Sequence, residues 1–166
     1  EEDYTRGQAC FAGSDEDKQK LREILKTEPD RFRSMERLST AGHFLCRSNV
    51  AARQLVGSGH NVYYYYFTHV RDGQKQWMGA HHAAEMPYVF DTGNQVLPSN
   101  EWDSFLTEAM GDYWANFVRA GNPNGKGHVQ WPLFKPDAGQ YLKIGDEIVT
   151  GESLESAVCA AIPIAY

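Results

Sequence analysis

Two neighbouring histidines, His81 and His82, are the residues of this chain best suited to acid–base chemistry. They stand in a stretch of small residues that opens at Gly79 and leads to Glu85, so the sequence predicts a loop that presents an imidazole. Imidazole titrates nearer neutral pH than any other side chain, which makes a histidine on a loop a candidate for moving protons. A hydrogen-bonded structural or surface histidine is the commoner situation, and this stretch alone leaves that alternative open.

The same residues allow a second interpretation, as a metal site. His82 and Glu85 are three positions apart, a spacing at which two ligands share one face of a helix, and His81 lies beside them. Metal sites usually draw on a further cluster of ligands, and none is evident in the sequence. The stretch therefore favours proton transfer, and no metal is expected.

An aromatic stretch and a long amphipathic segment flank the histidines. Residues 61–68 are almost entirely aromatic or β-branched, which predicts a strand buried on both faces of a sheet. Residues 101–120 carry apolar side chains at steps of three or four, which predicts a helix with one broad buried face. The fold class expected is α/β, with a mostly parallel sheet flanked by helices.

The remaining elements are shorter. Apolar periodicity, acidic first turns and Gly or Pro stops predict three helices before the aromatic stretch, two short strands late in the chain and a weak final helix. Their expected ranges are 15–27, 30–38 and 39–56 for the helices, 140–144 and 148–149 for the strands, and from about Glu152 onward for the final helix.

Composition narrows the class of protein. The chain has 166 residues, 42% of them hydrophobic, which is typical of a globular domain. Its net charge of -6, with acids and bases scattered, argues against a nucleic-acid surface. No apolar run approaches the length of a membrane span. The chain begins at Glu1 rather than Met, as expected of a processed chain or a fragment.

The stretch at residues 79–90 resembles the G-x-x-H-x-x-E-x-x-[YF]-[VIL]-F segment of type-B carboxylesterases, the cholinesterase-like branch of the α/β-hydrolase fold. Three further blocks agree in order and spacing: residues 62–69, 110–124 and 131–134. The similarity covers most of residues 40–145 and corresponds to the C-terminal third of such an enzyme. It implies that residues 1–166 are the C-terminal portion of a single α/β-hydrolase catalytic domain.

The resemblance implies roles for two residues. His82 aligns with the family's catalytic histidine, which takes the proton of a serine hydroxyl and returns it to the leaving alcohol. Glu85 matches a glutamate that supports the histidine loop without being the acid of the triad. Trp77, Met78 and Tyr88 are then candidates for the wall of a pocket that holds an apolar part of a small ester substrate. No cofactor is implied, since the triad and oxyanion hole supply the activation.

The serine elbow G-x-S-x-G and the glycine-rich oxyanion strand do not occur in the 166 residues. The expected function is therefore that of a serine-dependent carboxylic ester hydrolase only when an N-terminal portion of the same protein supplies the serine, the acid and the oxyanion hole. The alternative is a non-catalytic, cholinesterase-like adhesion or carrier domain.

The chain has three cysteines, Cys10, Cys46 and Cys159, and their spacing is not that of a metal site. The simplest arrangement of three cysteines is one long-range disulfide and one remaining thiol. In cholinesterase relatives a disulfide joins the helix before the aromatic strand to the C-terminal helix, which implies pairing of Cys46 with Cys159. Two buried thiols are the alternative, and Cys10 has no obvious partner. A disulfide implies an extracellular or secretory location, with a cytoplasmic one as the alternative.

Overall fold

The computed structural model describes residues 13–74, 79–93 and 98–164, so Trp77 and Met78 lie outside the described residues. The chain divides into two compact units. The first is made from both ends of the chain, residues up to 58 and from 153 onward, and the second is residues 59–152. Each unit has its own hydrophobic core.

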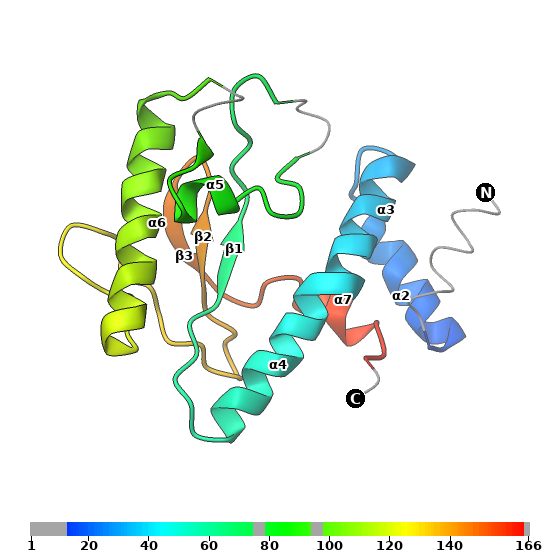
Figure 1. The fold of residues 1–166 in the computed structure, drawn as a ribbon. Helices are drawn as coiled ribbons and strands as arrows, with labels where there is room; N and C mark the ends of the chain where they lie inside the picture. Colours follow the sequence, from blue (N-terminus) through cyan, green and yellow to red (C-terminus); the bar gives the residue numbers. More distant parts are fainter. Residues whose placement is uncertain (1–12, 75–78, 94–97, 165–166) are drawn as a thin grey trace. The chain divides into compact units, whose positions relative to one another are not determined.

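The first unit is helical (Figure 1). It begins with α2 (Asp15–Leu25), where Ser14 closes a capping box with Asp17. The other helices are α3 (Arg31–Thr40), the π-helix η1 (Ala41–Leu45), α4 (Cys46–Gly57) and α7 (Ser156–Ala160). The predicted break near residue 39 is wrong, because α3, η1 and α4 follow one another without interruption. The π-helical turn η1 accommodates the irregular spacing of the apolar residues at this point.

Leu21, Leu38 and Val158 are fully buried in the core of the first unit, which brings α2, α3 and α7 together. A disulfide joins Cys46 to Cys159, as the family resemblance implied. Arg37 adds a half-buried ionic link, because its guanidinium contacts Glu28 at 2.9 Å and Glu155 at 2.8 Å. The two chain ends of this unit are thus held by a covalent bond, a core and an ion-pair network.

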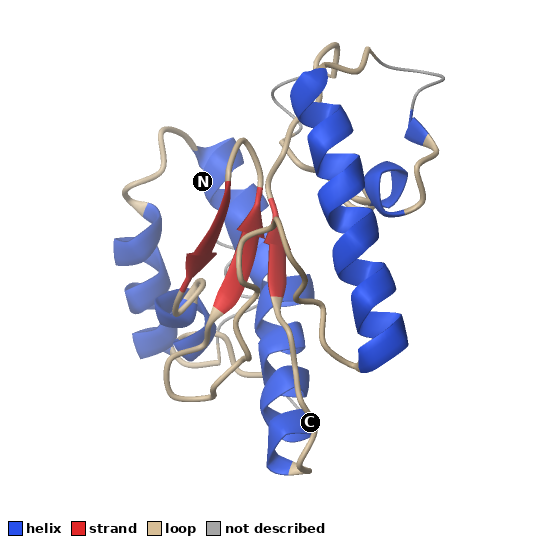
Figure 2. Cartoon of the chain, turned by 90° about the vertical axis from the view of Figure 1, so that its left-hand side faces the viewer, coloured by secondary structure: helices blue, strands red, loops and turns tan. Residues whose placement is uncertain are grey.

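The second unit contains a three-stranded sheet in the order β1-β2-β3 (Figure 2). β1 (Tyr65–Phe67) is parallel to β2 (Tyr141–Ile144), and β2 is antiparallel to β3 (Ile148–Gly151). The sheet is therefore mixed, and the prediction of a mostly parallel sheet is not confirmed by the described residues. The late strands were predicted, but β3 runs two residues further than expected, and the final helix starts only at Ser156.

The aromatic strand is shorter and less buried than predicted. Only three of residues 61–68 form ladder pairs, although Val62 also accepts a hydrogen bond from Phe134 N–H at 2.9 Å. Residues 62–68 are half-buried in the described chain. The alternate side chains Tyr63, Tyr65 and Phe67 pack on the core, as the two-residue period of a strand requires.

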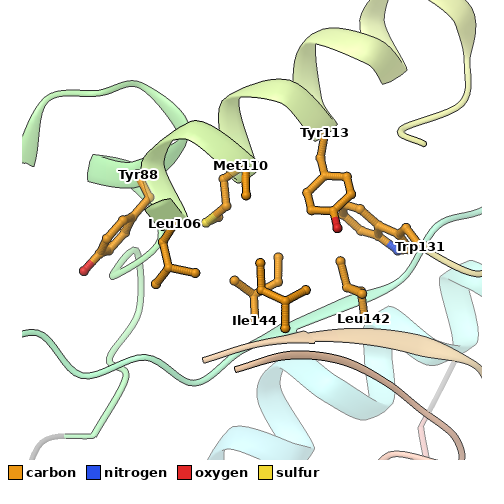
Figure 3. Close-up of a cluster of buried hydrophobic side chains, with 9 residues drawn as sticks. Tyr88, Leu106, Met110, Tyr113, Trp131, Leu142 and Ile144 are labelled. Carbon is orange, nitrogen blue, oxygen red and sulfur yellow. The ribbon is translucent and has the colours of Figure 1, made fainter. Parts of the chain in front are cut away.

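The long helix α6 (Glu101–Ala120) has the predicted bounds. Asn100 and Asp103 form a capping box at its start, and Gly121, with φ of 66°, ends it. Its buried face packs on the sheet, and Figure 3 shows these side chains meeting those of the strands. The labelled members of this cluster are Tyr88, Leu106, Met110, Tyr113, Trp131, Leu142 and Ile144.

None of the described helices is long and apolar enough to cross a bilayer.

Candidate active site

The histidine stretch lies beyond the carboxyl end of β1, the edge of a parallel strand pair at which functional loops gather in α/β proteins. Residues 82–85 form turns, and the short helix α5 (Met86–Val89) follows and packs against α6 (Figure 1). The Ala84 N–H donates to His81 O at 3.0 Å, and the Met86 N–H donates to Ala83 O at 3.2 Å. The loop is therefore closed by its own backbone.

His82 is exposed at the outer side of this loop. The next residue, Ala83, has φ of 67°, a left-handed conformation that costs an alanine about 1 kcal/mol or more. The backbone therefore reverses direction immediately after His82. An exposed imidazole on a backbone fixed in this way suits proton transfer.

His81 is also exposed, and its Nδ1 lies 2.9 Å from the carbonyl oxygen of His82. It lines a cavity of about 260 Å³ together with Tyr88, whereas His82 is not among the lining residues. Among the described residues, no group of three or more His, Cys, Asp or Glu side chains is placed to hold a metal ion.

Glu85 is held from the sheet. Its carboxylate lies near the Tyr65 hydroxyl, and burial together with the Glu85 charge raises the pKa of Tyr65. Glu85 O also accepts the N–H of Val89 at 3.1 Å in α5. Glu85 thus connects β1 to the end of the histidine loop, a contact in keeping with a supporting role.

Tyr88 is 4% exposed and belongs to the hydrophobic core as well as to the cavity beside His81. Its hydroxyl donates to Asp103 Oδ1 at 2.6 Å. Burial and this hydrogen bond raise the pKa of Tyr88, so the phenol stays neutral. Of the three candidates for a substrate wall, the structure describes only this one.

Sequence reasoning missed a buried polar cluster beside the loop, formed by His69, Tyr88 and Asp103. His69 Nε2 lies 2.9 Å from Asp103 Oδ1, and His69 Nδ1 lies 3.1 Å from Asp146 Oδ1. Burial alone would raise the pKa of Asp103, but hydrogen bonds from Tyr88, Asn100 and His69 outweigh it and lower that pKa. The one signal in the sequence was the N-cap pattern of Asn100 and Asp103, which predicts a helix start but no tertiary partner.

In α/β folds, functional loops gather beyond the carboxyl ends of parallel strands, and the exposed His82 lies beyond such a strand end. The chain belongs to the carboxylesterase family, whose model, described as "Carboxylesterase family", matches residues 14–162. Membership implies an α/β-hydrolase fold, of which the described residues show helices and a small mixed sheet.

Individual relatives agree with this assignment. Over 101 residues the chain is 37% identical to cocaine esterase of Homo sapiens, covering 57% of this chain and 18% of that protein. Over 122 residues it is 34% identical to carboxylesterase 5A of Canis lupus familiaris, covering 68% of this chain and 21% of that protein. It is 36% identical to acylcarnitine hydrolase of Mus musculus, over 57% of this chain and 18% of that protein. The chain thus spans about a fifth of the length of these relatives.

Proposed function

We propose that this chain supplies the general base and acid, His82, of a serine-dependent carboxylic ester hydrolase. The nucleophilic serine, the triad acid and the oxyanion hole then lie on an N-terminal portion of the same protein. The observation that carries the proposal is the exposed His82, held on a fixed turn beyond β1, in a chain whose family is that of the carboxylesterases.

In this reaction His82 takes the serine proton as the serine oxygen forms a bond to the ester carbonyl carbon. The tetrahedral intermediate then loses the alcohol, which leaves with the proton returned from His82. A water molecule attacks the acyl-enzyme in the same way, so that the carboxylic acid is released and the serine regains its proton. Glu85, fixed by Tyr65, keeps the loop in place during both halves.

Two features support completion by an N-terminal portion. β1 is an edge strand of the described sheet, although its aromatic sequence is typical of a strand with neighbours on both sides. In the same unit, large apolar side chains remain exposed at Phe90 (62%), Phe117 (46%) and Val118 (83%). Surfaces of this kind are usually covered by another part of the protein.

The proposed substrate is a small ester with an apolar acyl or alcohol group. Tyr88 lines the cavity next to the histidine loop, and Trp77 and Met78 precede that loop in the sequence. The Cys46–Cys159 disulfide supports maturation in an oxidising compartment, so we place the protein outside the cell or in the secretory pathway.

The test compares His82→Ala with His81→Ala in the protein completed by its N-terminal portion. We expect His82→Ala to lower kcat by about a thousandfold or more, because triad residues act together, and to prevent labelling of the serine by a fluorophosphonate. His81→Ala is the matched control and is expected to stay within about tenfold of the parent. Both variants should unfold at the parent temperature.

Equal losses from the two substitutions would refute the assignment of His82. A completed protein that neither hydrolyses esters nor reacts with the fluorophosphonate would instead indicate the non-catalytic adhesion or carrier role. Intact mass under native and denaturing conditions shows beforehand whether a larger species accompanies the 18.7 kDa chain.

A further inference from the structure

In the cluster of His69, Tyr88 and Asp103, the two oxygens of the Asp103 carboxylate make different contacts. Asp103 Oδ2 accepts the Asn100 N–H at 2.9 Å, which completes the cap of α6. Oδ1 takes no part in the cap and accepts from the Tyr88 hydroxyl at 2.6 Å, with His69 Nε2 at 2.9 Å. The helix cap therefore accounts for only one oxygen of a residue that is 2% exposed.

The contacts of Oδ1 connect three elements near the histidine loop. Tyr88 lies in α5, the helix that ends the loop, and His69 lies two residues beyond β1. The other ring nitrogen of His69 reaches Asp146, just after β2. The two ring nitrogens of His69 thus contact two different carboxylates, those of Asp103 and Asp146. The position of α5 is thus tied to the carboxyl ends of both parallel strands.

The loop that carries His82 is attached to the rest of its unit at both ends. At its start, the Gln74 side-chain amide donates to Gly79 O at 2.8 Å. At its end, α5 has only four residues, too few to hold a fixed position by its own backbone bonds. Its orientation must come from tertiary contacts, and the Tyr88 hydroxyl makes a short, buried one to a charged acceptor.

We propose that Tyr88, Asp103 and His69 are positioning residues that fix α5, and through it the His82 loop, relative to the strand ends. The inference rests on the proposed function, since it assigns these residues a role in aiming His82. None of the three touches the reacting atoms. Loss of the contact lets the imidazole shift, and a displacement of about 1 Å in a reacting group lowers turnover by as much as about a hundredfold.

The test uses Tyr88→Phe, with Tyr113→Phe as its matched control, in the completed protein. Both tyrosines are buried, at 4% and 1% exposure, and each hydroxyl donates one bond of 2.6 Å, that of Tyr113 to Val129 O. Tyr113 lies ten residues after Asp103 in α6, and its hydroxyl bonds to Val129, outside the histidine loop. The two variants therefore lose similar bonds, but only one of these bonds holds α5.

We expect Tyr88→Phe to lower kcat about tenfold with little change in KM, and to shift the midpoint of the pH profile of kcat/KM. Tyr113→Phe should leave kcat within about twofold of the parent and the pH profile unchanged. His69→Gln, which keeps a donor for Asp103, should retain more activity than His69→Ala.

Equal kcat values for the two tyrosine variants would overturn the positioning role. His82→Ala, measured beside them, separates this failure from that of the proposed function. If His82→Ala abolishes turnover while Tyr88→Phe behaves like Tyr113→Phe, only the positioning inference is wrong. If His82→Ala keeps full activity, the proposed function itself is wrong.

Discussion

Reduction of the Cys46–Cys159 disulfide should lower the free energy of unfolding by an amount that depends on how the two units unfold. The cysteines are 113 residues apart, and the chain-entropy model gives about 5 kcal/mol for closing a loop of that length. All of residues 59–152, the second unit, lie within this loop. If that unit stays folded when the first unfolds, only residues 47–58 and 153–158 form flexible loop, and the effect falls to about 3 kcal/mol.

The assay is urea denaturation of the Cys10→Ser protein with and without dithiothreitol, so that the third thiol cannot exchange with the disulfide. Far-UV circular dichroism and tryptophan fluorescence are followed together, because two cooperative units give transitions that do not coincide. A Cys46→Ala/Cys159→Ala variant should match the reduced protein. A change below about 1 kcal/mol on reduction, in either unfolding scheme, would refute the loop-closure argument.

Two further predictions concern the candidate site. Ala83→Gly should stabilise the protein by up to about 1 kcal/mol, because glycine adopts the positive φ of 67° without the cost that alanine bears, and a lower melting temperature than that of the parent would contradict this. Asp103, whose pKa is lowered by hydrogen bonds that outweigh its burial, should contribute stability above its unfolded pKa of about 4 and lose it as pH falls through the lower folded pKa. Asp103→Asn should therefore reduce the loss of stability between about pH 5 and pH 2, and an unchanged acid transition would argue against an ionised Asp103 in the fold.

Local signals in the sequence predicted the elements that position the site. The apolar period of residues 101–120 predicted α6 to the residue, because its N-cap and its terminal glycine are both local features. Family resemblance implied the disulfide. The histidine stretch was predicted as a loop, and residues 82–85 do form turns, although the helical turn of α5 was not foreseen.

The tertiary contacts of the site could not be predicted from local patterns in the sequence. The contact of His69 with Asp103 joins residues 34 positions apart, and neither residue stands in a pattern that indicates the other. The extent of the aromatic strand also depended on its partner, because β2 has four residues and only three of them pair with β1. Propensity predicts that a segment favours a strand, whereas its length in the sheet is set by the neighbour.

Both units are closed by segments that are synthesised long after the residues they contact. The parallel ladder cannot form until Leu142, the partner of Tyr65, has been synthesised. The disulfide of Cys46 likewise cannot form until Cys159 has been synthesised. During that interval on the ribosome, the aromatic residues 63–67 lack their partner β2, and unpaired segments of this kind are prone to associate with other chains. Because non-local pairing is slow, we expect folding to follow synthesis of this chain, and its yield to depend on chaperones that shield the aromatic segment.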